Sequence, residues 1–426
     1  MTMFSHRGGL PVFARGFLLL VFSSSGDILD DPDPTAIWAV RQLTMLSGKM
    51  DNATTPSRER KALASFIETD RELGDHFRKG LNPAEWDAFE SASFRLFGNL
   101  FNELDRLVAN FELIPRHGPG SVADRLTHPE RWKFDYWPER IDGVFPRWRY
   151  TSNLPSWSSM SPVPIWSEIP VKVIAVPKTK QKPRIIAIEP SSVQYAQQGL
   201  KRAIYEQVAR SPLSGILGFT DQTRNQVLAH EASLTGDLAT LDLSEASDRV
   251  HLSVVLKLLS RWPHLRDFVL ATRSRYADVN GEVILLHKFA SMGSALTFPL
   301  EAIVFTTIAL MGMERRSGKK LTLPSLLGRL SVYGDDIIIP VGATSDVVDL
   351  LTTFGFKVNE GKSFWTGWFR ESCGKEYFRG HDVSVVRLRA DPPGSRQDAA
   401  LLRRFTSFRN RAYRAGLWQT VKVADS

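Results

Sequence analysis

Two adjacent carboxylates stand at a predicted turn between two apolar strands, in the segment Ser331-Val-Tyr-Gly-Asp-Asp-Ile-Ile-Ile-Pro340. Neighbouring acids repel each other, so Asp335 and Asp336 are either a solvated turn or ligands of divalent cations. A third acid, Asp242, ends a predicted strand over residues 237–243 and has an apolar residue on each side. If the three carboxylates meet across adjacent strands, they can hold two Mg²⁺ ions about 3.5 to 4 Å apart. That arrangement activates an attacking oxygen and stabilises a leaving one.

The segment that follows Asp242 has a second interpretation as a helix start. Ser244 and Ser247 are good N-capping residues, and Glu245 and Asp248 favour the positive end of a helix. Capping does not account for Asp242, because burying an acid without a metal ion or a donor is costly. Asp242 is therefore the stronger functional candidate.

A basic turn separates two strand-like runs, 171–176 and 184–188, and this pattern predicts a hairpin with a cationic tip. Arginine offers a bidentate fork for phosphate, and lysine offers a mobile point charge. Taken alone, a charged hairpin tip is more often a solvated turn. The cations at this tip are Lys178, Lys180, Lys182 and Arg184.

The elements that must position these residues alternate without the regular rhythm of a doubly wound sheet, which favours an α+β fold. Apolar residues at helical spacing predict helices between residues 36 and 113, whereas residues 117–166 are irregular and rich in tryptophan. Further predicted elements are helices over 192–209, 255–259 and 297–311 and a hairpin over 330–340.

Composition sets broad limits on the class of protein. The chain has 426 residues, 43% of them hydrophobic, as in ordinary globular proteins, and its net charge of +8 weakly favours an anionic partner. The single cysteine, Cys373, excludes an internal disulfide framework and a cysteine-based zinc site and fits a reducing cytoplasm. The apolar stretch 17–22 is too short to span a bilayer, so we expect no membrane insertion.

Four segments, in this order, resemble the polymerase motifs of RNA phages (leviviruses) and their narnavirus, mitovirus and ourmiavirus relatives, most closely the phage replicases. The resemblance covers residues 171–418. It implies RNA-templated RNA synthesis by two-metal nucleotidyl transfer, for viral genome replication. The segments are Asp242-Leu-Ser-Glu-Ala-Ser-Asp-Arg249, Ser291-Met-Gly-Ser-Ala-Leu-Thr-Phe-Pro-Leu-Glu301, Tyr333-Gly-Asp-Asp336 and Phe369-Arg-Glu-Ser-Cys-Gly374.

The same resemblance implies a right-hand fold of fingers, palm and thumb. Residues 1–170 would form an N-terminal helical region and part of the fingers, and residues 171–236 the fingers with the basic hairpin. Residues 237–365 would form the palm, with an inserted fingers segment at about 262–290. Residues 366–426 would form the thumb and the C-terminal region.

Site residues can be carried over from the resemblance. Asp242 and Asp335 would bind two Mg²⁺ ions, with Mn²⁺ as a substitute, and Asp336 would be a weaker accessory ligand. Asp248 would lie near the ribose of the incoming nucleotide, where a carboxylate can read the 2′-hydroxyl. Many RNA polymerases have an asparagine where this chain has Glu301, so the carrier of this recognition stays open, with Ser294 as a substitute. The implied nucleotide-binding set is Lys178, Lys182, Arg184, Asp248, Ser291, Gly293, Ser294 and Thr297.

The C-terminal part adds a general acid and an RNA contact. Lys357 or Lys362 would protonate the leaving pyrophosphate, with Lys362 preferred, although both can be plain surface lysines. The segment that contains Arg370 is similar to a primer grip, with ordinary packing as the alternative. The C-terminal arginines form the strongest basic cluster and predict a thumb helix near the RNA backbone, with a solvated helix as the alternative. The predicted RNA-binding residues are Arg370, Arg403, Arg404 and Arg409.

The partners implied are an RNA template and product strand, ribonucleoside triphosphates, and host translation proteins as replicase subunits, in the cytoplasm of the infected cell. The chain is shorter than we expect of a phage replicase, chiefly on its N-terminal side. A reverse transcriptase is the nearest rival, but it would place an aromatic residue near the polar Ser247 and Asp248. Two further rivals are a non-catalytic RNA-binding scaffold with a polymerase-like fold and a two-metal nuclease, which would use similar acids.

Overall fold

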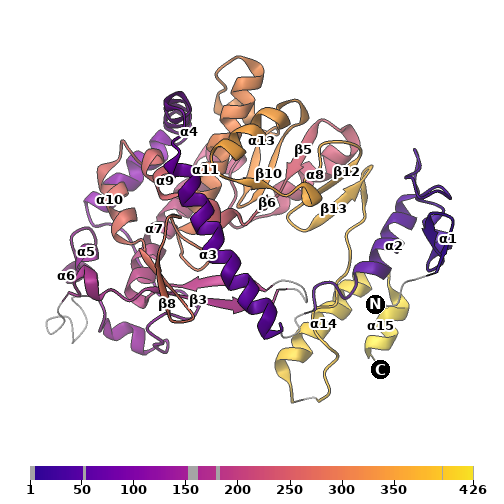
Figure 1. Ribbon diagram of the computed structural model, residues 1–426, viewed down its shortest axis with the longest axis horizontal. Coiled ribbons are helices and arrows are strands. Elements are labelled where there is room, and N and C mark those ends of the chain that lie inside the picture. The colour runs from indigo at the N-terminus through magenta and orange to yellow at the C-terminus, as the bar shows by residue number, and fades with distance from the viewer. Residues whose placement is uncertain (1–4, 51–53, 152–161, 179–182, 396, 426) are drawn as a thin grey trace.

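A computed structural model describes residues 5–50, 54–151, 162–178, 183–395 and 397–425. Helices and strands are interspersed along the chain, which confirms the α+β class. Figure 1 shows a larger body that holds the main sheets and a smaller group of helices at one end, near which both chain termini lie. The smaller group consists of α1 (Arg15–Leu18), α2 (Pro34–Met45), α14 (Ala399–Arg414) and α15 (Trp418–Asp425).

The helical stretch predicted between residues 36 and 113 consists of three long helices. Each begins at a proline, whose fixed φ suits the first helical position and whose missing N–H is not needed there. The side chain before each proline, Asp33, Thr55 or Asn82, accepts a backbone N–H and caps the helix. Besides α2, these helices are α3 (Pro56–Arg78) and α4 (Pro83–Ala109).

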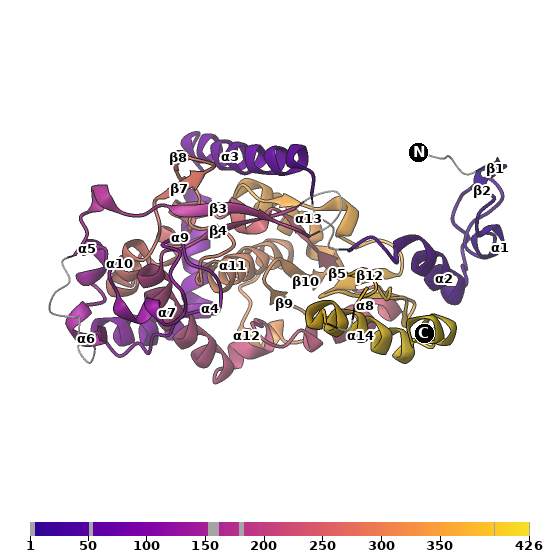
Figure 2. The same cartoon turned by 90° about the horizontal axis from the view of Figure 1, so that it is seen from below.

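The predicted hairpin is confirmed as β3 (Val171–Val176) paired antiparallel with β4 (Arg184–Ile188). It belongs to a four-stranded sheet of order β4-β3-β7-β8, in which β7 runs parallel to β3. The added strands are β7 (Tyr276–Val279) and β8 (Glu282–Leu285). Helix α3 packs along β3 and β4 (Figure 2) and buries Leu63 and Phe66 against this sheet.

A second sheet, which we call the central sheet, has the strand order β5-β10-β9. Its strands are β5 (Leu238–Leu241), β9 (Ser331–Tyr333) and β10 (Asp336–Pro340), and Ile337 pairs with Leu241. Alternate residues of β10 face opposite sides. Ile337 and Ile339 enter the main core with α11 (Thr297–Ser317), whereas Ile338 packs with residues of α8 (Thr223–Thr235). The predicted hairpin over 330–340 is confirmed, and it is held between two helices.

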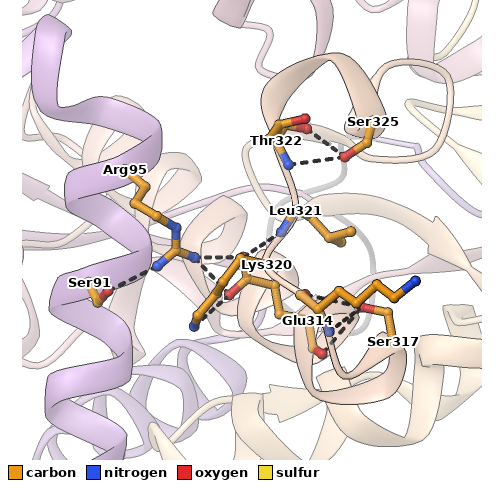
Figure 3. Close-up of polar contacts among 9 residues, drawn as sticks. Ser91, Arg95, Glu314, Ser317, Lys320, Leu321, Thr322 and Ser325 are labelled. Carbon is orange, nitrogen blue, oxygen red and sulfur yellow. Dashed lines mark hydrogen bonds and ion pairs between the residues drawn. The ribbon is translucent and has the colours of Figure 1, made fainter.

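Helix α11 has the length and hydropathy of a membrane span, but 94% of that window is buried inside the protein. Its C-terminal end is fastened by Glu314, whose side chain is only 7% exposed. Both carboxylate oxygens of Glu314 accept from Arg95 of α4, at 2.6 and 2.7 Å, and Lys320 and the N–H of Leu321 also donate to it (Figure 3). The cluster joins α4, α11 and the following loop, and so orients the helix that supports the central sheet.

The remaining elements surround these layers. Most of them pack into one continuous core with α4 and α11. The helices are η1 (Glu130–Lys133), α5 (Glu139–Asp142), α6 (Arg147–Thr151), η3 (Ile165–Ser167), α7 (Ser191–Ala209), η4 (Pro212–Gly215), η5 (Ala246–Arg249), α9 (Leu252–Leu258), α10 (Pro263–Ala271), α12 (Leu323–Leu326), η6 (Val341–Ala343), α13 (Thr344–Thr353) and η7 (Glu360–Lys362). The strands are β1 (His6–Arg7), β2 (Leu10–Pro11), β6 (Leu243–Ser244), β11 (Lys357–Val358), β12 (Phe369–Ser372), β13 (Lys375–Phe378) and β14 (His381–Asp382).

Candidate active site

A cleft of about 900 Å³ lies where β5 ends and the β9–β10 hairpin turns. Its walls come from α2, α3, the β3–β4 hairpin, residues 242–248, the region around the start of α11 and residues 359–371. The predicted metal ligands Asp242 and Asp335 and the predicted fingertip cations Lys178 and Arg184 all line it. The fold therefore brings acids and cations from distant parts of the sequence into one solvent-filled space.

Asp242 is held firmly where the chain passes from β5 to β6. Its N–H donates to Oγ of Ser363 at 3.0 Å, and its carbonyl oxygen accepts from the N–H of Asn359 at 2.8 Å. The side-chain amide of Asn359 donates to Oδ2 of Asp242 at 2.8 Å, and Nζ of Lys362 lies 3.4 Å from the same oxygen. With a side chain 19% exposed, Asp242 is fixed in place while it faces the cleft.

Lys362 is the lysine of the predicted pair that reaches the acids. Burial works to lower the pKa of Lys362, but attraction to Asp242 and Glu371 outweighs it, so the net shift is upward. Lys357 pairs instead with Glu72 of α3 at 2.8 Å and does not line the cleft. A cation that stays protonated beside Asp242 is suited to anionic oxygens entering the cleft.

The two acids of the hairpin turn point in different directions. Asp335 lines the cleft, where desolvation and then the charge of Asp242 raise its pKa. Oδ1 of Asp336 accepts from the N–H of Cys373 at 3.2 Å and from Oγ of Ser372 at 3.3 Å, and burial followed by repulsion from Asp335 raises the pKa of Asp336 to about 6. The expected meeting of three carboxylates is therefore corrected. Among the described residues, no group of three or more His, Cys, Asp or Glu side chains is placed to hold a metal ion.

The pair Asp242 and Asp335 nevertheless suits a hard divalent cation. Mg²⁺ is usually held by one or two carboxylates, with water and substrate phosphates completing its coordination. Burial and then repulsion from Asp242 raise the pKa of Asp335, and a bound cation would relieve the repulsion. Two aspartates rather than three form the fitting donor set in this structure.

Asp248 lines the same cleft from η5. Nζ of Lys288 donates to its Oδ1 at 3.0 Å, and the side chain of Asp248 is 19% exposed. No side chain caps η5, and Glu245 before it has a left-handed φ of 55°. The capping interpretation of this segment is therefore wrong, and Asp248 is placed by a lysine from elsewhere in the chain.

Three of the predicted nucleotide-binding residues, Ser291, Ser294 and Thr297, form hydrogen bonds that hold the loop before α11 in place. Oγ1 of Thr297 donates to the carbonyl oxygen of Ser291 at 2.8 Å, and Oγ of Ser294 donates to Gln197 at 3.1 Å. None of the three lines the cleft. The role of Ser294 in reading a 2′-hydroxyl stays a prediction; in this structure its hydroxyl donates to Gln197 and does not line the cleft.

The loop presents other side chains to the cleft. Gly293 has a φ of +132° and lies so close to β4 that a Cβ there would be 2.0 Å from the carbonyl oxygen of Ala187. Met292, Phe298 and Glu301 line the cleft instead. Burial, followed by repulsion from nearby acids, raises the pKa of Glu301 well above its usual range, and its Oε2 is buried without a partner among the described residues. A neutral carboxyl group can both donate and accept, as an asparagine amide does.

The basic hairpin contributes Lys178 and Arg184 to the cleft, whereas Lys180 and Lys182 lie outside the described residues. Desolvation, and then the charges of Arg184 and Lys362, lower the pKa of Lys178. Like charges that crowd together at the mouth of a cleft attract anions. Lys178 and Arg184 are therefore placed where they could bind phosphate, as predicted for the hairpin tip.

Arg370 is not available to RNA. Its side chain is fully buried, and its guanidinium donates to backbone carbonyl groups, with the shortest bond 2.6 Å to Leu238. The prediction that Arg370 binds RNA is wrong, because the residue fastens the loop before β12 to β5. Two other cations that line the cleft, Arg41 and Lys49, were missed by the sequence analysis, and Arg387 of the predicted C-terminal basic cluster also lines it.

The three predicted C-terminal arginines differ in their surroundings. Arg409 forms a two-bond ion pair with Asp425, at 2.7 and 2.8 Å, and Arg404 donates to the carbonyl oxygen of Arg389 at 3.1 Å. Arg403 is exposed and lines a hollow of about 480 Å³ on α14 together with Arg411 and Arg414. Arg403, Arg411 and Arg414 therefore form a basic face of α14 that does not include Arg409.

The sequence can now be set beside those of known proteins. The model of the family described as RNA replicase, beta-chain, matches residues 168–419, which include every acid of the cleft. This chain belongs to that family. Two relatives illustrate the match, the RNA-directed RNA polymerase subunit beta of Qbeta virus (strain MX1), 39% identical over 220 residues, and the RNA-directed RNA polymerase beta chain of Escherichia phage MS2, 37% identical over 218 residues. Each alignment covers 51% of this chain, but only 35% and 37% of the relatives, so this replicase-family chain spans little more than a third of their length.

Solved structures that are similar to this replicase-family chain are also polymerases by their names. The match to a structure named RdRp complex covers 76% of this chain and 31% of the matched chain, with 10% sequence identity and a TM-score of 0.42. The match to the BmCPV RNA-dependent RNA polymerase in its elongation state covers 70% of this chain and 29% of the matched chain, with 11% sequence identity and a TM-score of 0.41. Both TM-scores lie below 0.5, so the family assignment rests on the sequence match.

Proposed function

We propose that this chain carries the catalytic site of an RNA-directed RNA polymerase that copies viral RNA from ribonucleoside triphosphates. The observation that carries the proposal is the single cleft in which Asp242 and Asp335 face Lys178, Arg184 and Lys362. Paired aspartates suit divalent cations, and the basic side chains suit a triphosphate. Membership of the RNA replicase beta-chain family supports the same reaction.

In the proposed reaction, the 3′-hydroxyl of the growing strand loses its proton to solvent water, and its oxygen bonds to the α-phosphorus of a nucleotide. The bond from the α-phosphorus to the oxygen that bridges it to the β-phosphorus breaks, and pyrophosphate leaves. Two Mg²⁺ ions, or Mn²⁺, held by Asp242 and Asp335 would supply the positive charge that the attacking and leaving oxygens need. Lys178 and Arg184 bind the triphosphate oxygens, and Lys362 donates a proton toward the leaving pyrophosphate. Template base pairing selects the nucleotide, while the protein supplies position and charge.

The wider assignments follow from this function. We propose that residues 171–236 act as fingers, residues 237–365 as palm and residues 366–426 as thumb, with the exposed Arg403 face of α14 near the RNA backbone. The proposed ligands are template RNA, product RNA and ribonucleoside triphosphates. Host translation proteins are the proposed additional subunits, and the cytoplasm of the infected cell is the proposed location.

The test is incorporation of labelled ribonucleotides by the purified chain on a short single-stranded RNA, with and without Mg²⁺. Asp335→Asn is the test variant, and Asp349→Asn, an exposed aspartate on α13, is the matched control. We expect template-length product from the wild type and from the control, none from Asp335→Asn, and unchanged RNA binding by all three. Product from Asp335→Asn at the wild-type rate would overturn the assignment.

A parallel reaction with deoxyribonucleotides separates the polymerase from its rivals. Preferred deoxyribonucleotide incorporation would favour a reverse transcriptase. Shortening of the template without synthesis would favour a nuclease, and Mg²⁺-independent RNA binding without synthesis would favour a scaffold.

A further inference from the structure

A fully buried lysine lies directly behind the cleft. Lys288 is 0% exposed, and its ammonium lies 3.4 Å from the ring centroid of Phe66 and 3.0 Å from Oδ1 of Asp248. Removing an ammonium group from water costs free energy, and the contacts with the Phe66 ring and the Asp248 carboxylate offset only part of that cost. An apolar side chain of similar length would fill the same space without this cost. We therefore assign the charge of Lys288 to its hydrogen bond with Asp248 rather than to packing.

Helix α3 fixes both partners of this pair. Asp70 of α3 is 3% exposed and accepts from the backbone N–H groups of His287 and Lys288, each at 3.0 Å. On the same helix, Thr69 donates to Glu245 at 3.1 Å, in the loop that leads to Asp248. The helix lies outside the segment that the family model matches, yet it determines where Lys288 and Asp248 meet. Figure 1 shows α3 running across the molecule beside the strands and loops that it fastens.

The anchoring leaves one oxygen of Asp248 for a ligand. Oδ1 is bonded to Lys288, and within the described residues Oδ2 has no hydrogen-bond partner. Asp248 lines the cleft that also holds Asp335 and Glu301. A carboxylate only accepts hydrogen bonds, so its natural partner in a nucleotide site is a sugar hydroxyl rather than a phosphate.

We propose that Lys288 is a positioning residue: it holds Asp248 so that the free oxygen can accept the hydrogen bond from a ribonucleotide 2′-hydroxyl that the resemblance to RNA phage polymerases implies for Asp248. In this role Lys288, supported by Phe66 and Asp70, sets the preference for ribonucleotides over deoxyribonucleotides. The inference rests on the proposed polymerase function and extends it to a residue that does not itself touch substrate.

The test compares ATP with dATP in single-nucleotide extension of a primed RNA template, with kcat and KM measured for each. The variants are Lys288→Met, Asp248→Asn and the double variant. Lys257→Met is the control, because Lys257 is likewise an ion-paired lysine, 2.5 Å from Glu90, but its side chain is 26% exposed and lies away from the cleft. Binding of ATP and dATP is also measured by calorimetry, which needs no turnover.

We expect Lys288→Met to lower the ATP to dATP ratio of kcat/KM by about tenfold or more, chiefly through KM for ATP, as loss of a hydrogen bond to a charged group implies. The values for dATP should change by less than about threefold. The double variant should lose no more than Asp248→Asn loses, because Lys288 acts through Asp248. Lys257→Met should match the wild type.

An unchanged ratio in folded Lys288→Met, or losses that add in the double variant, would overturn the inference. If Lys288→Met does not fold, Phe66→Leu replaces it, since this change removes the ring face and keeps the site apolar. A ratio unaltered by Phe66→Leu would then reject the proposal. An inactive wild type would count against the proposed function, and the calorimetric preference for ATP and its loss in the variants would still decide the role of Lys288.

Discussion

Asn359 holds Asp242 at two points, because its side-chain amide donates to Oδ2 and its backbone N–H donates to the carbonyl oxygen, both at 2.8 Å. The two bonds join β11 and the following turn to the end of β5. They leave one carboxylate oxygen of Asp242 facing the cleft with a set direction. The candidate metal ligand is thus oriented by a neutral donor, while the cation Lys362 lies 3.4 Å from the same carboxylate oxygen.

Asn359→Ala should therefore weaken catalysis more than folding. A hydrogen bond to a charged group contributes about 1.5 to 3 kcal/mol, so we expect nucleotide incorporation to fall about tenfold or more. Asn110→Ala is a matched control, because Asn110 donates to Glu112 on the surface, 3.3 Å away. Incorporation rates and melting temperatures of both variants check the prediction. A normal rate in Asn359→Ala would show that the backbone bond alone orients Asp242.

Asp335 and Asp336 should differ in importance despite being neighbours. Asp335 faces the cleft, whereas Asp336 is bonded to the N–H of Cys373. Loss of a metal ligand removes several kcal/mol of charge stabilisation, so Asp335→Asn should reduce incorporation about a thousandfold or more. Asp336→Asn keeps an acceptor for Cys373 and should retain roughly a tenth of the rate or more. Incorporation assays at saturating Mg²⁺ distinguish the two variants. Equal losses of incorporation would indicate that Asp336 is also a metal ligand.

Gly293 should not tolerate a side chain. An alanine there would combine a left-handed backbone with a Cβ 2.0 Å from the carbonyl oxygen of Ala187. The loop would have to move away from β4, and with it Met292 in the cleft wall. We expect Gly293→Ala to destabilise the fold by about 1 to 3 kcal/mol and to lower incorporation. Gly342→Ala is the control, because nothing lies within 4 Å of its Cβ position. Denaturant unfolding measures both, and similar stabilities would contradict the prediction.

His117 should make the fold sensitive to acid. Its ring packs against Trp132, Phe134 and Tyr195, and its Nε2 is buried without a partner among the described residues. Burial lowers the pKa of His117 from 6.5 to about 4. Between these values the unfolded chain binds more protons than the folded one, so stability is lost as pH falls below 6.5. Thermal melts at pH 7.5 and 5 should show a larger decrease for the wild type than for His117→Phe, and equal decreases would exclude this role.

Local structure followed the sequence closely in several places. The strands of the basic hairpin begin and end where the apolar runs do, and the helix predicted over 297–311 continues as α11 to Ser317. These elements depend on side-chain period and on turn residues close in sequence. The predicted helical stretch before residue 113 is divided into separate helices, with new helices beginning at Pro56 and Pro83, each after a capping residue.

The site shows the same division between local pattern and tertiary contact. The sequence by itself pointed to Asp242, Asp335 and Asp336 as the candidate acids, because an isolated acid among apolar residues and a Gly-Asp-Asp turn are local features. Only the tertiary structure decided that Asp336 turns toward Cys373, that Arg370 is buried, and that Lys288 lies behind Asp248. The direction of a side chain depends on which distant segment packs beside it, and no spacing within one segment carries that information.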